Sequence, residues 1–242
     1  METWLDYTLT DFLLFAPRTY YRLVALHNAA LWPLHLAVLA AGAAILWMVF
    51  AGRKAWRGRA IAALLGAAWL FVAWAWHLQR YDGINFAGRW FAAAFALQGM
   101  LILALGVAAD RLRPAPRAHA AGIVGAAIFA ATLALYPLMA VAFGRGTGAA
   151  ELFAIAPDPT AVGTLGLLLL PARIPWLLLP VPVLWCIVTG LTLWTMEAPD
   201  AFVAPLAAVL VLGLALWKAR AGASAQTNGV QVSGRGGTSR SR

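Results

Sequence analysis

Long apolar blocks, separated by short charged connections, occupy most of the chain from about residue 31 to residue 217. Most blocks have close to 20 residues, the length that an α-helix needs to cross the hydrocarbon core of a bilayer. Only 11% of the 242 residues are charged and 63% are hydrophobic, whereas a soluble domain has about a quarter charged residues. The sequence therefore predicts an all-α fold, a polytopic transmembrane helical bundle, because a soluble fold could not bury this much apolar surface.

Six of these blocks have the length and composition of complete spans. They lie at residues 31–51, 60–78, 86–109, 120–143, 176–196 and 201–217. A seventh block, 157–172, would form a helix only about 24 Å long, short of the roughly 30 Å hydrocarbon core. Its length is compatible with either a short full span or a re-entrant hairpin.

The distribution of basic residues decides between these two topologies. With seven spans and the N-terminus outside, 13 of the 18 Lys and Arg residues fall on one side, together with only one acid, Asp110. The positive-inside rule places that side in the cytoplasm. A hairpin would instead move Arg173 and the basic tail outside. We therefore predict about seven spans, with the N-terminus outside and the C-terminus cytoplasmic, in a multi-pass protein of the bacterial cytoplasmic (inner) membrane.

The chain is expected to divide into three regions. Residues 1–29 form an N-terminal interfacial segment, retained in the protein, in which a helix starts near Pro17 and lies at the outer interface or continues into the first span. Residues 30–217 form the transmembrane helical domain. Residues 218–242 are rich in Gly and Ser with scattered Arg, which predicts a disordered basic cytoplasmic tail.

Polar residues inside or beside the apolar blocks are the candidates for a site, because such groups are costly in lipid. In the predicted topology they gather at the outer half of the bundle. The candidate polar site consists of Arg89, Asn85, His27, His77, Asp158 and Thr160. A competing interpretation makes Arg89 an interfacial residue paired with Asp82. Gln98 lies deeper and is predicted to form a helix–helix hydrogen bond.

The stretch APDPT, residues 156–160, is expected at the outer face, at the start of the fifth helix. In one interpretation Asp158 is the N-cap and Pro159 occupies the first helical position, with no ligand involved. In the other, the recessed helix start borders a hollow shared with Arg89 and one histidine, where an anionic or carbonyl group would bind. The first is favoured, because Asp158 as the cap would already use the free N–H groups.

No catalytic residue, cofactor or metal-ligand set is predicted. The spans hold no GxSxG, P-loop, GxGxxG or HExxH pattern, and the single Cys186 excludes an intrachain disulfide. Two histidines on different helices could hold haem or a metal, but no acid-rich surroundings accompany them. The net charge of +9 is explained by membrane orientation and contact with anionic lipid, so the expected partner is the lipid bilayer and not nucleic acid.

Three segments carry a resemblance to known proteins. They are LLFAPRTYYRL (13–23), INFAGRWFAAAFALQG (84–99) and APDPTAVGTLGLLLL (156–170). In these segments the chain resembles a family of bacterial polytopic integral membrane proteins known only as a domain of unknown function. The resemblance extends to about Trp217. It implies a membrane fold and brings no activity, substrate or site residue with it.

Three functions remain open at this point, none of them enzymatic. The first is a small-solute transport or permeation protein with an outward-facing polar cluster. The second is a non-catalytic membrane subunit, or an assembly or scaffold protein, whose small-residue helix faces bind a partner or form a homo-oligomer. A haem- or metal-binding redox protein is the third.

Overall fold

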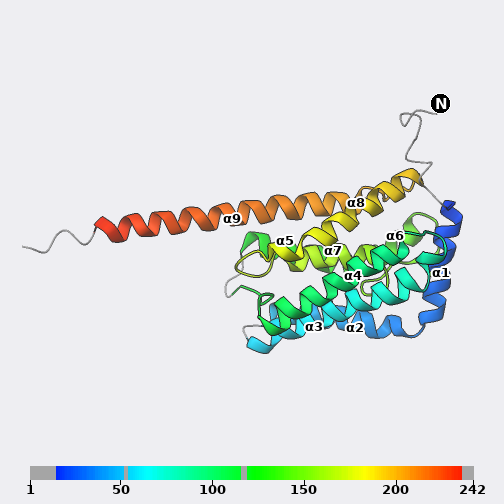
Figure 1. The fold of residues 1–242 in the computed structure, drawn as a ribbon, viewed down its shortest axis with the longest axis horizontal. Helices are drawn as coiled ribbons and strands as arrows, with labels where there is room; N and C mark the ends of the chain where they lie inside the picture. Colours follow the sequence, from blue (N-terminus) through cyan, green and yellow to red (C-terminus); the bar gives the residue numbers. More distant parts are fainter. Residues whose placement is uncertain (1–14, 52–53, 116–118, 236–242) are drawn as a thin grey trace, which may run out of the picture.

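The computed structural model describes residues 15–51, 54–115 and 119–235, and throughout these ranges the regular elements are helices (Figure 1). A helix satisfies every backbone N–H and C=O group within its own segment, which an apolar surrounding demands. The predicted all-α fold is therefore confirmed. In the same ranges the β-type pairing is limited to one isolated bridge, between Pro114 and Pro171.

The helices follow the predicted apolar blocks closely. They are α1 (Pro17–Leu31), α2 (Leu34–Phe50), α3 (Ala55–Val72) with its π-helical extension η3 (Ala73–Leu78), α4 (Gly88–Ile102) with its π-helical extension η5 (Leu103–Ala108), α5 (Ala120–Ala134), α6 (Tyr136–Ala142), α7 (Pro157–Leu167), α8 (Pro180–Thr195) and α9 (Val203–Arg235). Helix α9 continues past the predicted end of the last span. Residues 1–14 and 236–242, parts of the predicted N-terminal segment and tail, lie outside the described residues.

Within the described ranges, four helical segments are long and apolar enough to cross a membrane, and six if each of two bent helix pairs is one span. The bent pairs are α1 with α2 and α5 with α6. Large apolar side chains such as Phe50, Trp90 and Leu206 are exposed on the outside of the bundle, where lipid is their favourable surrounding. These features indicate a membrane-associated protein.

Helix α1 begins at Pro17, which occupies one of the first two helical positions, so the predicted start is confirmed. Proline is tolerated there because the first N–H groups of a helix have no intrahelical partner. The axis of α1 makes an angle of 90° with that of α2, and in Figure 1 α1 lies across one end of the bundle. Its buried face includes Tyr20, Val24 and His27.

Helix α7 is buried along its whole length, from Pro157 to Leu167. It lies among α3, α5, α8 and α9 and comes closest to α5, where a Cβ atom added to Gly125 would lie 2.3 Å from the carbonyl oxygen of Gly166. Small residues permit this approach of two backbones. A helix enclosed by other helices has no lipid contact, so its length need not match the bilayer, which explains the short apolar block.

Helix α7 leads from the α1 end of the bundle to the end where α5 begins. Before its start, Asn28 of α1 donates hydrogen bonds to the carbonyls of Gly148 and Ala150. After its end, the amide of Ala115 donates to Leu170 O at 2.9 Å. Lys218 of α9 donates to Leu169 O at 2.9 Å and also contacts Pro171 O. The connections before α5 and after α7 therefore meet at one end of the bundle.

Candidate functional site

Two of the six residues predicted as a polar site, the exposed Arg89 and the half-buried Asn85, have local partners. Arg89 pairs with Asp82, Nε to Oδ1 at 3.4 Å, and its side chain is 65% exposed. Asn85 accepts a hydrogen bond from the amide of Ala87 and donates one to the hydroxyl of Tyr81. Arg89 thus forms the ion pair with Asp82 that the competing interpretation predicted.

The other four predicted residues are buried inside the bundle. Asp158 accepts hydrogen bonds at 2.7 Å from Trp185 Nε1 and from Thr189 Oγ1 of α8. His77 packs its ring against Trp185, with the ring centroids 5.0 Å apart. The Nε2 atom of His27 lies 3.4 Å from Ile155 O. The structure therefore connects His77 to Asp158 through Trp185, and it separates this buried group from Arg89.

The predicted capping role of Asp158 is wrong. The N-cap of α7 is Ala156, no side chain caps it, and Pro157 is already helical. This register turns the carboxylate of Asp158 toward α8 instead of back to the helix start. Thr160 completes the first turn, since its hydroxyl accepts from Ala154 N at 2.9 Å and donates to Ala156 O at 2.7 Å.

The deeper polar residue Gln98 has the role that the sequence predicts. Its Nε2 atom donates a hydrogen bond to Leu178 O at 2.9 Å. The acceptor lies in η7 (Trp176–Leu178), the short 3₁₀ turn that precedes α8. Gln98 is therefore a packing contact between helical segments, as predicted.

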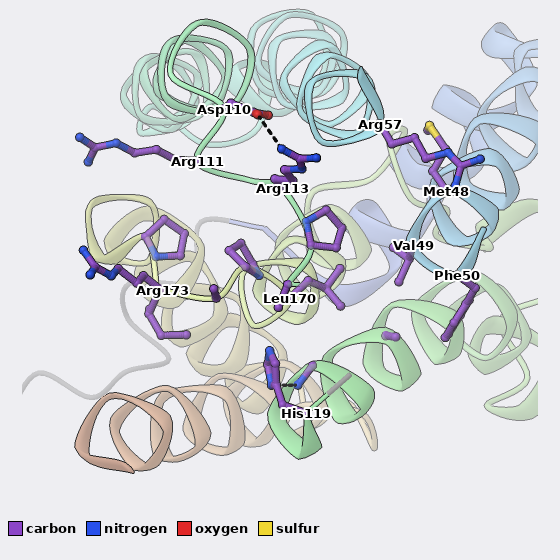
Figure 2. Close-up of a pocket in the computed structure, with 18 of the residues that line it drawn as sticks. Met48, Val49, Phe50, Arg57, Asp110, Arg111, Arg113, His119, Leu170 and Arg173 are labelled. Carbon is purple, nitrogen blue, oxygen red and sulfur yellow. Dashed lines mark hydrogen bonds and ion pairs between the residues drawn. The ribbon is translucent and has the colours of Figure 1, made fainter. Parts of the chain in front are cut away.

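A cavity of about 1110 Å³ lies at the end of the bundle where α5 begins (Figure 2). It is bounded by the end of α2, the start of α3, the connection between η5 and α5, the first turns of α5, and the connection after α7. Five basic side chains line it, against one acid, Asp110. The basic residues are Lys54, Arg57, Arg111, Arg113 and Arg173. Its volume is slightly above the range for small-molecule sites, roughly 300–1,000 Å³.

The interior walls of the cavity are largely apolar. They are formed by Met48, Val49, Ala126, Leu170 and Ile174, and the exposed side chains of Phe50 and Ile123 lie at the rim. In Figure 2, Arg111 and Arg173 lie on one side of the cavity, Arg57 lies beside Met48 on the other, and Arg113 lies between them. The basic side chains thus come from separate parts of the chain, and those of Arg111 and Arg173 extend away from the apolar interior in Figure 2.

Packing holds two of these arginines in place. The guanidinium of Arg57 lies 5.0 Å from the ring centroid of Trp47 and 5.6 Å from that of Trp56, favourable cation–π distances. Arg113 Nη1 lies 4.0 Å from Asp110 Oδ2. A single carboxylate for five cations leaves the cavity strongly positive, and low-dielectric walls focus such a field.

A family model matches most of the chain. The model for "Family of unknown function (DUF6064)" matches residues 18–226. The chain belongs to this family. Searches of the curated proteins and of the solved structures each found no match. All residues that line the cavity of this DUF6064 protein lie within the matched range.

His119 and Lys218 fix one edge of the cavity in this DUF6064 protein. His119 Nδ1 accepts a hydrogen bond from the amide of Gly122 at 2.9 Å and so caps α5. Its Nε2 atom lies 3.1 Å from Lys218 Nζ. Burial, and after it the positive charge of Lys218, lower the pKa of His119, so the imidazole is neutral at neutral pH.

Sequence reasoning missed this cavity in the DUF6064 protein. From the sequence, the basic residues that line it indicated only a membrane orientation. They are Lys54, Arg57, Arg111, Arg113 and Arg173. The available signal was that they come from three connections predicted on the same side of the membrane. Helix packing decides which of these connections meet around a cavity, and the positions of the basic residues in the sequence do not predict it.

Proposed function

We propose that this DUF6064 protein is a small-solute transport or permeation protein of the bacterial cytoplasmic membrane, and that its solute is an anion held in the basic cavity. The observation that carries the proposal is the cavity of about 1110 Å³ with five basic side chains and one carboxylate. Cations around an apolar interior bind an anion through charge-assisted hydrogen bonds.

The chemistry of the cavity favours binding over catalysis. Among the lining residues, His119 is of the type most often used for general acid–base work, and both of its ring nitrogens already face partners, Gly122 N and Lys218 Nζ. The arginine side chains carry hydrogen-bond donors and no acceptor. These groups hold and neutralise an anion without transferring a proton to it.

The proposed membrane topology counts α7 as the fifth of seven spans, with the N-terminus outside and the C-terminus in the cytoplasm. The basic cavity then opens to the cytoplasm. A short enclosed helix such as α7, followed by an irregular connection, is typical of solute sites in transporters. On the opposite side, the aromatic rings of Phe91, Phe95 and Trp185 surround His77. In this topology the structure represents an inward-open state. The polar residues predicted to face outward then lie on its closed side.

Reporter fusions test this topology. Fusions after Arg57, Arg113 and Arg220 are expected to give cytoplasmic signals, and a fusion near Asp82 is expected to give an external signal. The physical reason is the 13-to-5 division of basic residues between the two sides. An external signal at Arg220 would overturn the seven-span topology and support a hairpin in place of α7.

Anion binding tests the proposed function. The purified chain in nanodiscs of zwitterionic lipid is titrated with inorganic phosphate and with succinate, and thermal stabilisation is measured. The double variant Lys54→Gln/Arg173→Gln is expected to weaken binding roughly tenfold or more, because each charged hydrogen bond contributes about 1.5–3 kcal/mol before solvent screening. Both side chains are exposed, so the bundle should remain folded.

Arg89→Gln is the matched control, since it removes one positive charge at the other end of the bundle and should leave anion affinity unchanged. Equal weakening by this control, or the lack of any anion-dependent stabilisation, would contradict the proposal. Uptake of the stabilising anion into proteoliposomes then distinguishes transport from binding alone.

A second candidate function is a non-catalytic membrane subunit or scaffold protein. The observation that favours it is the length of α9, 33 residues, which carries the helix well beyond the rest of the bundle in Figure 1. A projecting helix offers a contact surface for another chain. If neither anion stabilises the protein, this second function becomes the better account.

A further inference from the structure

A second group of charged residues lies at the α1 end of the bundle, opposite the basic cavity. Arg145 and Glu151 belong to the connection between α6 and α7, and Asp200 belongs to the connection between α8 and α9. With Tyr136 they line a small cavity of about 10 Å³. That is close to the space that a single water molecule requires, about 10–15 Å³.

The ion pair in this group is buried and incompletely satisfied. Arg145 Nη2 lies 2.5 Å from Asp200 Oδ2, and the two side chains are only 12% and 7% exposed. The guanidinium also lies 4.8 Å from the ring centroid of Tyr21. Among the residues that the structure describes, Asp200 Oδ1 and Arg145 Nε have no hydrogen-bond partner. A buried acceptor and a buried donor thus belong to residues that line the cavity.

Three carboxyl groups share this region with one arginine. If Glu151, Asp158 and Asp200 were all ionised, Arg145 would leave two negative charges uncompensated. Uncompensated charge in a low-dielectric interior is costly, and the usual response is that one group keeps a proton.

The hydrogen bonds indicate which carboxyl group keeps the proton. Asp200 accepts a hydrogen bond from Arg145, whose Nη2 lies 2.5 Å from Asp200 Oδ2. Asp158 has two short donors at 2.7 Å, from Trp185 and Thr189. Glu151 has only the hydroxyl of Tyr20, at 3.4 Å. Good donors stabilise the ionised form, so Glu151 is the carboxyl group whose ionised form is least supported.

We propose that Glu151 is a proton-binding site, which holds one proton at neutral pH in this conformation and releases it when the Arg145–Asp200 pair separates and water enters. Burial, and after it the negative charge of Asp158, raise the pKa of Glu151 well above its usual range. The ionisable groups that face Glu151 come from several elements. They are Tyr20 and Tyr21 of α1, Tyr136 of α6, Arg145, Asp158 of α7 and Asp200.

A proton held in this way links protonation to the opening of one end of the bundle. Opening hydrates Glu151 and favours its ionised form, and closing restores the proton. Coupling of this proton to anion movement rests on the proposed function, whereas proton binding by Glu151 does not. The two ideas can therefore fail separately.

Infrared difference spectroscopy of the full chain in nanodiscs tests the proton site directly. At neutral pH the wild type is expected to show the carbonyl stretch of a protonated carboxylic acid, and Glu151→Gln is expected to lose this band completely. Glu197→Gln, at an exposed position, should keep it. Loss of the band in the control, or no such band in the wild type, would overturn the proposal.

Thermal denaturation over a range of pH gives a second readout. The folded state binds the Glu151 proton more tightly than the unfolded state. The stability that this proton contributes is therefore fully present below the unfolded pKa of Glu151, and it is lost as pH rises through the raised folded pKa. Glu151→Gln should keep the neutral-pH Tm and flatten its decline at higher pH. A large drop in Tm at neutral pH for Glu151→Gln would show that the ionised form is the native one. Anion affinity, measured on the same samples, reports separately on the basic cavity.

Discussion

Replacing Gly166 by valine is expected to separate α5 from α7 and to cause the largest loss of stability in this bundle. A Cβ atom at this position would lie 2.6 Å from the carbonyl oxygen of Gly125 and 3.1 Å from Ile128 Cγ2. The nearest atom belongs to backbone, so no rotamer change relieves the contact. Overpacking typically costs about 1–3 kcal/mol, and occasionally more. We expect a cost at or above the top of this range, measured as a lower apparent Tm of the purified protein.

Gly213→Ala is the matched control for this prediction. Gly213 also lies in a helix, α9, but a Cβ atom added there would meet nothing within 4 Å beyond the neighbouring backbone of its own helix. Alanine is also the better helix former by roughly 1 kcal/mol, so the control should be neutral or stabilising. An unchanged Tm for Gly166→Val would mean that α5 and α7 do not pack this closely.

Asp158→Ala is expected to have the second-largest effect. The substitution removes the acceptor for Trp185 Nε1 and Thr189 Oγ1, each at 2.7 Å, and leaves both donors buried without a partner. Hydrogen bonds to a charged group contribute about 1.5–3 kcal/mol each, so the free energy of unfolding should fall by about 3 kcal/mol or more. The measurement is thermal denaturation in detergent, followed by tryptophan fluorescence, which also reports the changed surroundings of Trp185.

Two other variants calibrate the Asp158 effect. Asp158→Asn keeps a carbonyl oxygen for Trp185 and should be destabilised less than the alanine variant. Thr192 lies in α8, as Trp185 and Thr189 do, and its hydroxyl donates to the backbone carbonyl of Val188 in that helix. Thr192→Val removes this hydroxyl and should change Tm little. If Asp158→Ala and Thr192→Val behave alike, the carboxylate does not hold α7 to α8.

The sequence alone was enough to predict the helices of this protein, because helix formation in an apolar surrounding depends on local properties. The length of each apolar block predicted α2, α3, α4, α8 and the start of α9 within a few residues. Pro17 marked the start of α1 because a proline is favourable at that helical position. Gln98 was identified as a helix contact because an amide in lipid needs a partner.

Only the tertiary structure decided where α7 lies and what its polar residues contact. Whether a 16-residue apolar block faces lipid or other helices depends on the close approach of Gly125 to Gly166, and small residues are too frequent in this chain to single out that pair. The N-cap prediction for Asp158 failed because the same PDP motif permits two helix registers. The choice between them depends on Trp185 and Thr189, which lie 27 and 31 residues further along the chain.

The basic cavity and the Glu151 group are also products of tertiary structure. Their residues come from connections far apart in the sequence, and charge counting assigns such residues to a side of the membrane without saying which of them meet. Local chemistry therefore determined the helices and their approximate ends. Packing determined the site, because the electrostatic field of a cavity and the protonation of a carboxyl group depend on neighbours that only the folded chain brings together.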